Sequence, residues 1–486
     1  MWTSINQALN IIDNFVWGVP LMVLIIAGGL LLTIRLGLLQ IRKLPLALKW
    51  MLQNEEGGKG EISSFSALCT ALSATIGTGN IVGVATAVCA GGPGALFWMV
   101  VAAFLGMATK YSEGLLAVKY RTVAEDGHSL GGPFYYIELG MGKNFKWLAK
   151  IFAFFGVCVG LFGIGTFSQV NGISSAVHGF FDPNDAFTVK ILPFLGEYSW
   201  SVIIASLILS FCVAAVLIGG VKRIASVSQI IVPFMAVIYF VFAVILICCN
   251  ITKVPAAFAT IVTAAFSPKA ITGGAVGSML IAMQKGVARG IFSNEAGLGS
   301  APIAAAAAQT NSPVRQGLVS MTGTFIDTII ICTLTGLSIV LTGAWQVEGL
   351  EGVQVTTYAF QHGLPFPAQF SSFILMLCLV FFAFTTILGW DYYSERCLEY
   401  LSGGNMKHVK IFRWIYILAV FIGPYMTVSA VWTIADIFNG LMAIPNMIAL
   451  FALSGFIVKK PEHFFCMQKK RHSQSTVLSK KCVKRI

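Results

Sequence analysis

Residues 66–88 read SALCTALSATIGTGNIVGVATAV, an apolar run long enough to cross a bilayer, which takes about 20 residues. The midpoint of this run is GTGN at 77–80, although glycine is a poor helix former. In hydrocarbon every backbone N–H and C=O needs a partner, so a break is tolerated only inside protein or against a cavity. The stretch therefore predicts a membrane helix broken at its centre, unless the glycines serve only for close helix crossing.

Such a break exposes two kinds of backbone group at one place. The half-helix that starts near Thr78 presents free N–H groups and a positive dipole end, and the half that ends near Ile76 presents free carbonyls. Gly77 and Gly79 permit the backbone angles that end a helical turn. The break could thus hold an anion and a small cation, and a carboxylate and Na⁺ both suit it.

The composition places the whole chain in the membrane. Of its 486 residues, 57% are hydrophobic and only 11% are charged, whereas a soluble domain carries about 25% charged residues. The 11 cysteines form no CxxC pair, and we interpret them as small apolar residues within helices. We therefore expect an all-α polytopic membrane protein without a catalytic site, not an enzyme.

Eleven segments are long and apolar enough to span a bilayer. They are residues 15–34, 66–88, 94–118, 147–178, 199–219, 228–250, 275–308, 316–343, 368–395, 411–429 and 432–457. The first is treated as an extra N-terminal span, and the others are numbered one to ten.

Lys and Arg indicate the orientation of these spans, because they accumulate in cytoplasmic loops. With the N-terminus outside and the C-terminus in the cytoplasm, nearly all of the 32 fall on the cytoplasmic side, Lys110 counted among them. The outside holds only Lys190, Lys253 and Lys269. The net charge of +12 is thus a topology signal that needs no nucleic acid. We expect a cell-membrane protein, in the bacterial inner membrane, with a solvated basic tail that could also contact anionic lipids.

A second interrupted segment lies at 279–308, MLIAMQKGVARGIFSNEAGLGSAPIAAAAA. It carries Lys285, Arg289 and Glu295, and charges at this depth usually line a cavity or pair internally. This segment is the sixth span counted from the GTGN helix, so two five-helix halves of opposite orientation each begin with a broken helix. That is the pattern of an inverted-repeat transporter. The predicted divisions are 1–62 for the extra span and loop, 63–252 and 253–458 for the two repeats, and 459–486 for the tail.

The eighth span adds oxygen atoms that could complete a cation site. Residues 381–390 read FFAFTTILGW, with adjacent hydroxyls at Thr385 and Thr386. Each could simply bond the carbonyl one turn back. Alternatively, both hydroxyls and the Phe382 carbonyl face the inner half of the GTGN helix, where hard cations take oxygen ligands.

These stretches resemble the alanine or glycine:cation symporter family, which has the leucine-transporter type of inverted-repeat fold. The resemblance rests on GTGNIVGVATA at 77–87, GGPGALFWM at 91–99, GGPFYYIE at 131–138 and FSNEAGLGSAP at 292–302. It implies a Na⁺ site between the first and eighth spans. The ligands that it implies are the carbonyls of Ser73, Ile76 and Phe382 and the hydroxyls of Thr385 and Thr386.

The resemblance also implies a substrate carboxylate on the amides near Thr78 and Gly79, with Asn80 orienting it or reaching a second cation. Gln169 and Asn171, polar at mid-depth in the third span, either read the substrate or bond across helices.

Phe292 and Trp390 are either walls around a small side chain or ordinary packing aromatics. Walls this bulky would favour alanine or glycine over leucine. Asp327, in TFIDTII, could neutralise Arg289 or Lys285 as a buried pair, or serve the cation.

The sequence thus predicts a Na⁺-coupled symporter that carries alanine and glycine into the cell. A proton-coupled carrier of the same fold is the nearest alternative, with Lys285 or Arg289 in the place of the cation. A channel and a non-transporting amino-acid sensor are alternatives from other classes.

Overall fold

The computed structural model describes residues 2–53, 55, 57–124, 127–190, 197–266, 279–425, 428–461 and 463–464. The described chain is almost entirely helical, as predicted. The α-helices are α1 Trp2–Val16, α2 Val19–Arg35, α3 Leu39–Arg42, α4 Leu44–Met51, α5 Ser64–Thr75, α6 Val84–Gly91, α7 Gly94–Lys119, α8 Pro133–Tyr135, α9 Lys146–Phe162, α10 Phe167–Phe181, α11 Trp200–Leu217, α12 Gly220–Cys249, α13 Val254–Phe266, α14 Met279–Asn294, α15 Ala301–Ala306, α16 Pro313–Thr324, α17 Thr333–Thr342, α18 Val353–Gly363, α19 Ala368–Leu401, α20 Met406–Ile422 and α21 Val428–Ala452.

Shorter elements connect or interrupt these helices. The π-helical turns are η1 Gly79–Gly83, η2 Tyr136–Met141 and η5 Phe325–Cys332, and the 3-10 turns are η3 Lys143–Phe145, η4 Ile251–Lys253, η6 Ala344–Gln346 and η7 Gly423–Tyr425. The strands are β1 Thr122–Val123, β2 Ser129–Leu130, β3 Thr188–Lys190 and β4 Glu197–Ser199. They form two small antiparallel hairpins, β1 with β2 and β3 with β4.

Helix ends follow the sequence signals at several of these elements. The side chains of Ser63, Ser199, Ser312 and Asn405 each accept a hydrogen bond from a backbone N–H in the first turn of α5, α11, α16 and α20. Such caps satisfy one of the free N–H groups that begin every helix. Gly343, at φ 71°, ends α17 in the left-handed conformation that glycine adopts without strain.

Length and hydropathy identify the helices that could cross a membrane. In the described ranges eight helices qualify, and a ninth span is added if the bent pair α5 and η1–α6 is one. The predicted number of eleven is not reproduced by this count. The sixth predicted span is divided into α14 and the six-residue α15, and α20 has only 17 residues. Part of the sixth span, residues 275–278, lies outside the described residues.

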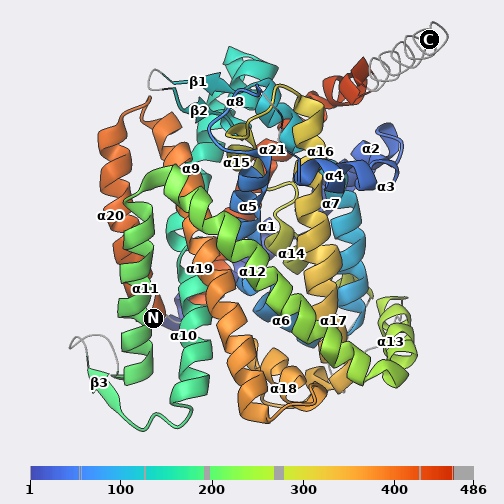
Figure 1. Cartoon of the computed structure of the whole chain (residues 1–486), viewed down its shortest axis with the longest axis vertical. Coiled ribbons are helices and arrows are strands. Elements are labelled where there is room, and N and C mark those ends of the chain that lie inside the picture. Colours follow the sequence, from blue (N-terminus) through green and yellow to red (C-terminus); the bar gives the residue numbers. More distant parts are fainter. Residues whose placement is uncertain are drawn as a thin grey trace, which may run out of the picture.

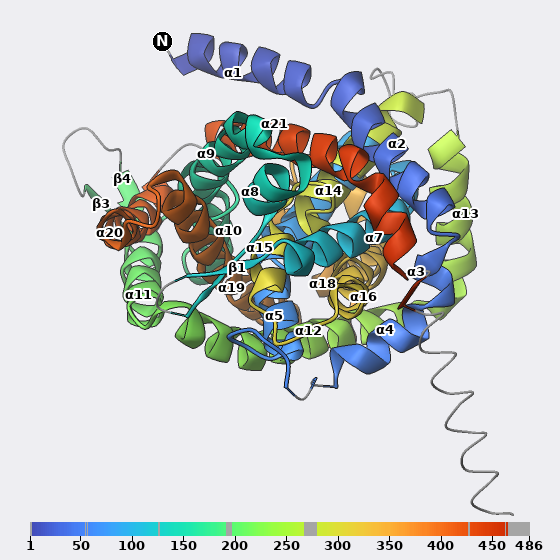
Figure 2. The ribbon, with the colours of Figure 1, turned by 90° about the horizontal axis from the view of Figure 1, so that it is seen from above.

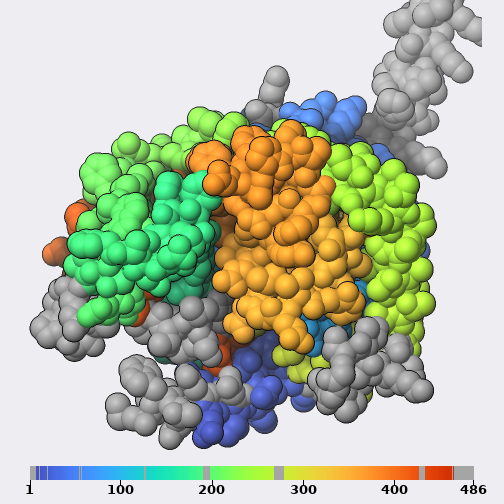
Figure 3. All heavy atoms as spheres, turned by 90° about the horizontal axis from the view of Figure 1, so that it is seen from below, coloured from blue at the N-terminus to red at the C-terminus, as the bar shows by residue number. Residues whose placement is uncertain are grey.

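The broken helices lie in the middle of the molecule. Viewed from above, α5, α14 and α15 are surrounded by α2, α13, α12, α11, α20 and α21 (Figure 2). In Figure 1, α12 crosses the front of the molecule at a slant. α4 and β1–β2 lie toward the upper end of the molecule. In Figure 3, which views the lower end, α18 and the neighbouring orange segments lie between α13 on one side and green helices on the other.

Several helices were not predicted. α1 is an amphipathic helix ahead of the extra span, and it lies along the periphery of the molecule (Figure 2). The third predicted span is interrupted at 163–166, between α9 and α10. α13 and α18 are short helices in regions that were predicted as loops.

Candidate functional site

The GTGN segment is broken as predicted. α5 ends at Thr75, and Ile76 makes the last helical hydrogen bond, from its N–H to the Leu72 carbonyl at 2.8 Å. The chain becomes helical again at Thr78, and the two halves are bent by 52°. Ile76, Thr78 and Asn80 are all 0% exposed. The backbone groups freed by the break therefore face protein, as the membrane requires.

α19 meets the α5 side of the break through its threonine pair. Thr386 Oγ1 lies 3.3 Å from the Ile76 carbonyl oxygen and 3.0 Å from that of Phe382. Thr385 Oγ1 lies 3.0 Å from the same Phe382 oxygen. The structure thus brings four of the five residues expected to hold a cation into contact, with their oxygens close together.

Ser73, the fifth expected ligand, also faces α19. A Cβ added to Gly389 would lie 2.8 Å from Ser73 Oγ and 2.8 Å from the Ala74 nitrogen. Glycine at 389 is therefore required for α19 to approach α5 this closely. The Ser73 hydroxyl itself donates to the Thr70 carbonyl at 2.7 Å.

The amides of the break are satisfied by two side chains. The Thr78 N–H donates to Gln169 Oε1 at 3.0 Å, and the Gly77 N–H donates to Asn80 Oδ1 at 2.9 Å. Thr78 Oγ1 is buried and has no hydrogen-bond partner among the described residues. Gln169, on α10, therefore occupies with a neutral oxygen the position where a carboxylate oxygen was expected. Asn171 is buried on the same helix.

Asp327 connects three elements around the break. Its Oδ1 accepts from Asn80 Nδ2 at 2.7 Å, and its Oδ2 accepts from Ser293 Oγ at 2.9 Å and from Thr328 Oγ1 at 2.6 Å. Asp327 lies in η5, so the carboxylate joins the seventh span to both broken spans. Asn80 thereby links the Gly77 amide to a buried negative charge.

The predicted pair between Asp327 and Arg289 needs correction. Arg289 forms a bidentate ion pair with Asp436 of α21, at 3.0 and 2.7 Å. Lys285 is exposed, and its Cβ lies beside Gly91 at the end of α6. Asp327 instead accepts its hydrogen bonds from neutral donors. Asp436 is 147 residues from Arg289 in the chain, a separation at which no local sequence pattern links the two.

The break in the sixth span contains three residues with positive φ angles. Glu295, Gly297 and Gly299 all have positive φ, of 56°, 93° and 83°. Glu113 Oε1, from α7, accepts from the Gly297 N–H at 3.1 Å and from Asn446 Nδ2 at 2.7 Å. Asn446 Nδ2 also donates to the Gly297 carbonyl at 2.9 Å. Side chains of α7 and α21 thus replace the helical hydrogen bonds that this loop lacks.

The two aromatic residues expected as pocket walls lie at the breaks. A Cβ on Gly79 would lie 3.3 Å from the Phe292 ring, so this ring contacts the first break. The Trp390 indole N–H donates to Glu295 Oε1 at 2.8 Å, and Ser300 Oγ donates to Glu295 Oε2 at 2.5 Å. Trp390 therefore joins α19 to the second break through a hydrogen bond that the sequence analysis did not foresee.

Four further residues of the centre were missed. Lys110 was assigned to a cytoplasmic loop, but it lies within α7 and is 2% exposed. Glu113, Asn446 and Asp436 were not considered. Lys110, Glu113 and Asp436 share one signal that could have found them, since a charged residue within an apolar span is a functional candidate by default.

Comparison with known proteins identifies relatives along nearly the whole chain. The sequence profile described as "Sodium:alanine symporter family" matches residues 2–478. An uncharacterized transporter of Haemophilus influenzae is 54% identical over 470 residues, covering 96% of this chain and 98% of the relative. The sodium/alanine symporter AgcS of Methanococcus maripaludis is 46% identical over 465 residues, covering 94% and 96%. The probable sodium/glutamine symporter GlnT of Bacillus subtilis is 36% identical over 457 residues, covering 93% and 89%.

Proposed function

Because the chain belongs to the sodium:alanine symporter family, we propose that it carries small neutral amino acids, alanine and glycine, into the cell together with Na⁺. The observation that carries this proposal is the meeting of the Ile76 carbonyl, the Phe382 carbonyl and the Thr386 hydroxyl at the first break. Family membership supports a transporter rather than an enzyme, and amino-acid and sodium transport are the properties named for relatives.

In this proposal Na⁺ binds between α5 and α19. The carbonyls of Ser73, Ile76 and Phe382 and the hydroxyls of Thr385 and Thr386 supply oxygen ligands, the type that hard cations take. Here each threonine hydroxyl donates its proton to a carbonyl. Na⁺ would take over those carbonyl lone pairs, while the hydroxyl oxygens turn their own lone pairs toward the ion.

The amino acid would bind on the other side of the same break. Its carboxylate takes the Thr78 and Gly79 amides, and displaces Gln169 Oε1 from the Thr78 N–H. The released Gln169 amide, with Asn171 two residues further along α10, can then bind the substrate. Phe292 and Trp390 bound the space for the side chain, and Asp327 fixes Asn80 against the Gly77 amide or serves a second cation.

Coupling follows from the two ligands sharing one broken segment of the chain. Na⁺ fixes the end of α5 against α19, which orders the amides that hold the carboxylate. We expect a coupling free energy of about 1–3 kcal/mol, and by thermodynamic linkage the amino acid strengthens Na⁺ binding by the same factor. Release toward the cytoplasm then requires the bundle to rock around the site.

The function is tested by uptake of labelled alanine into proteoliposomes with an imposed Na⁺ gradient or an imposed pH gradient. The proposal predicts accumulation with the Na⁺ gradient and none with the pH gradient alone. Uptake driven equally by pH without Na⁺ would favour the proton-coupled carrier. An ion current without alanine would indicate a channel, and binding without uptake would indicate a sensor.

Thr386→Val tests the cation site within the same assay. The substitution keeps the shape of the side chain and removes the oxygen next to the Ile76 carbonyl. The Na⁺ concentration for half-maximal uptake should rise at least tenfold, because one ligand oxygen is lost. Thr342→Val is the matched control, since among the described residues the Thr342 hydroxyl bonds only carbonyls of its own helix, at 2.8 and 3.3 Å. Equal Na⁺ dependence in both variants would remove Thr386 from the site.

A further inference from the structure

Asp391, on α19, is a buried carboxyl group to which no described group donates a hydrogen bond. The residue is 0% exposed, and neither Oδ1 nor Oδ2 has a hydrogen-bond partner among the described residues. Taking an ionised carboxylate out of water without a partner costs several kcal/mol even after relaxation. A carboxyl group in this position is therefore expected to be neutralised, by a proton or by a cation.

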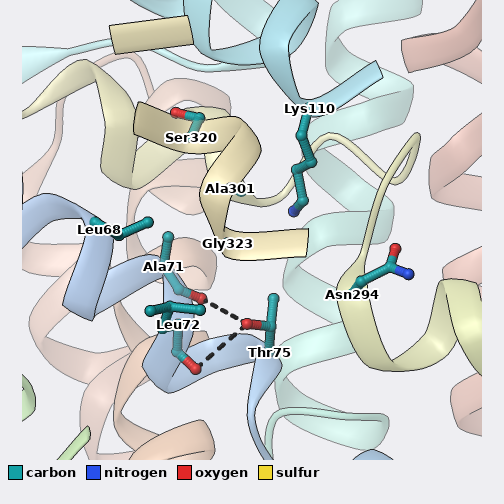
Figure 4. A pocket seen from close by; sticks show the side chains of 9 residues that line it. All are labelled: Leu68, Ala71, Leu72, Thr75, Lys110, Asn294, Ala301, Ser320 and Gly323. Atoms are coloured by element: carbon teal, nitrogen blue, oxygen red, sulfur yellow. Dashed lines mark hydrogen bonds between the residues drawn. The ribbon is translucent and has the colours of Figure 1, made fainter. Parts of the chain in front are cut away.

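Lys110 shows how another buried charge of this protein is compensated. Its ammonium group extends from α7 toward Gly323, beside a small void between α5, α7 and α16 (Figure 4). Three buried carboxyl groups interact with it electrostatically: Glu113, Glu295 and Asp327. Asp391 has no comparable surplus of opposite charge, because the arginines that act on it are already paired.

Two arginines interact electrostatically with Asp391, and each is paired with a different carboxylate. Arg413, of α20, donates from Nε and Nη2 to the two oxygens of Glu395, at 2.6 and 2.9 Å. Arg396 Nη1 lies 2.7 Å from Glu399 Oε2. A bidentate guanidinium pair uses both oxygens of the carboxylate as acceptors. Of the two neighbours Asp391 and Glu395, Glu395 is therefore the ionised one.

The other groups around Asp391 offer it no charge to pair with. Tyr416, also of α20, interacts with Asp391 electrostatically, but its hydroxyl donates to two backbone carbonyls, at 2.8 and 2.9 Å. α9 packs against the same stretch of α19 through two glycines, Gly156 and Gly160. Among the described residues, the charged groups that act on Asp391 are thus Glu395, Arg396 and Arg413.

A proton fits this environment better than a metal ion. Metal ions in proteins take several ligands, and the described part of the chain contains no group of three or more His, Cys, Asp or Glu side chains that could hold one. A proton needs no further ligand and no cavity, because it bonds covalently to one carboxyl oxygen.

We propose that Asp391 is a proton-binding site, and that the pair Asp391–Glu395 shares one proton and one guanidinium. While Arg413 is engaged with Glu395, the carboxyl group of Asp391 carries the proton. The two acidic residues are one helical turn apart and lie on the same face of α19. Release of the proton to water would set two carboxylates against the one guanidinium of Arg413, and would weaken the ion pair that joins α20 to α19. The site contains none of the residues assigned to Na⁺ or to the amino acid, so the inference goes beyond the proposed function.

Infrared spectroscopy of the purified full-length protein at neutral pH tests whether Asp391 is protonated. The C=O stretch of a neutral carboxyl group is separate from the bands of carboxylates and amides. The difference spectrum between the wild-type protein and Asp391→Asn therefore isolates the contribution of this group, and it should contain the band of one protonated carboxyl. Asp391→Asn is expected to fold, because the amide matches the neutral acid in shape and charge.

Glu138→Gln is the matched control, because the Glu138 carboxylate lies 3.0 Å from Lys146 Nζ. Its difference spectrum should show the loss of carboxylate bands and no protonated band. Glu395→Gln tests the competition for Arg413. This substitution frees the guanidinium for Asp391, so the protonated band should disappear in this variant at the same pH.

Thermal unfolding across a range of pH provides a second measurement. A group that is protonated in the folded protein and ionised in the unfolded protein lowers stability as pH rises. Above neutral pH, the Tm of the wild-type protein should therefore fall more steeply with pH than the Tm of Asp391→Asn. Glu138→Gln should keep the wild-type slope.

Three results would overturn the proposal. One is a difference spectrum of Asp391→Asn without the protonated band, because Asp391 would then be ionised and held by a metal cation or an arginine. Another is an equal slope of Tm against pH in the wild-type protein and Asp391→Asn. The third is persistence of the protonated band in Glu395→Gln, which would contradict the sharing of Arg413. Neither measurement involves transport, so a failure of Na⁺-coupled uptake would leave these results unaffected.

Discussion

At the scale of single residues, the first break depends on close packing of its backbone against neighbouring helices. A Cβ at Gly77 would lie 2.5 Å from Thr386 Oγ1 and 2.9 Å from Gln169 Oε1. Glycine at this position therefore serves contact with two of the proposed ligand residues as well as the turn itself. The sequence explained this glycine by the break alone. The atoms that leave no room for a Cβ belong to α10 and α19.

Gly77→Ala is expected to abolish most alanine uptake. Overpacking of a close-packed site costs about 1–3 kcal/mol, so the apparent affinity for Na⁺ or alanine should fall about fivefold to 150-fold. Gly83→Ala is the control within the same span, because its Cβ would meet nothing within 4 Å. Wild-type uptake by Gly77→Ala would show that the close packing of Gly77 against Thr386 and Gln169 is not part of the site.

Asp327→Asn tests the connection between Asn80 and the seventh span. The substitution removes the charge that accepts from Asn80, Ser293 and Thr328. We expect the alanine concentration for half-maximal uptake to rise at least tenfold, or the uptake rate to fall at least tenfold. The reason is that hydrogen bonds to a charged group contribute about 1.5–3 kcal/mol. Unchanged uptake with unchanged Na⁺ dependence would remove Asp327 from the mechanism.

Contacts of single residues could be predicted only where a feature of the sequence marked both partners. The oxygens of Ile76, Phe382 and Thr386 were expected to meet, and they do. Each segment carries a local anomaly in an apolar run, and the family resemblance pairs the two segments. Asp436 is also a charged residue within an apolar span, but nothing in the sequence links it to Arg289, 147 residues away, so Arg289 was given the wrong partner. Lys110 was misassigned because a single Lys near a span end was read as a loop residue.

At the scale of elements, both broken spans were predicted from their glycines and polar residues. What holds each break open could not be predicted, because the supporting side chains come from other helices. Glu113 of α7 and Asn446 of α21 support the second break. The interruption between α9 and α10 was missed because the run of apolar residues through Gly163 and Gly165 looks continuous.

Glu113→Ala should destabilise the second break. It leaves the Gly297 N–H and the Asn446 amide without their acceptor, and an unsatisfied buried polar group costs about 1–3 kcal/mol. We expect a lower Tm for the purified protein, whereas Glu113→Gln, which keeps one carbonyl oxygen, should lose less.

A double-mutant cycle with Asn446→Leu isolates this contact. If Glu113 and Asn446 act on the same loop, the two single losses in unfolding free energy will not add in the double variant. Strictly additive losses would contradict a shared role.

At the scale of the whole molecule, the segment before the first broken span is joined to the segment after the second. Ile62, ahead of α5, forms a parallel bridge with Ala308, after α15. Arg121 donates to four backbone carbonyls here, at 2.6–3.2 Å; they belong to Lys59, Ala306, Ala308 and Thr310. At the other broken half, Arg289 of α14 pairs with Asp436 of α21. The arginine contacts thus support both broken spans, which agrees with the full burial of the first break.

Arg121→Gln should loosen the fastening without changing the breaks. We expect faster hydrogen exchange of the amides of Glu61, Ile62 and Gln309, whose acceptors are the carbonyls of Ala307 and Ile62. Arg223→Gln, at an exposed arginine of α12, is the control and should leave these rates unchanged. Equal exchange in both variants would show that Arg121 does not hold this end closed.

The overall class and the family were predictable from composition and from motifs spread along the chain. The orientation in the membrane and the division into two repeats remain predictions from charge and span order. The orientation depends on how the chain lies in the bilayer, and the repeats depend on how its two halves are related. No local sequence pattern determines either.

Equilibrium binding of labelled alanine to the purified protein, titrated across Na⁺ concentrations, tests the shared break most directly. If one break holds both ligands, Na⁺ will raise alanine affinity about fivefold to 150-fold, and alanine will raise Na⁺ affinity by the same factor. Alanine binding that is saturable but independent of Na⁺ would contradict a common site for the ion and the amino acid.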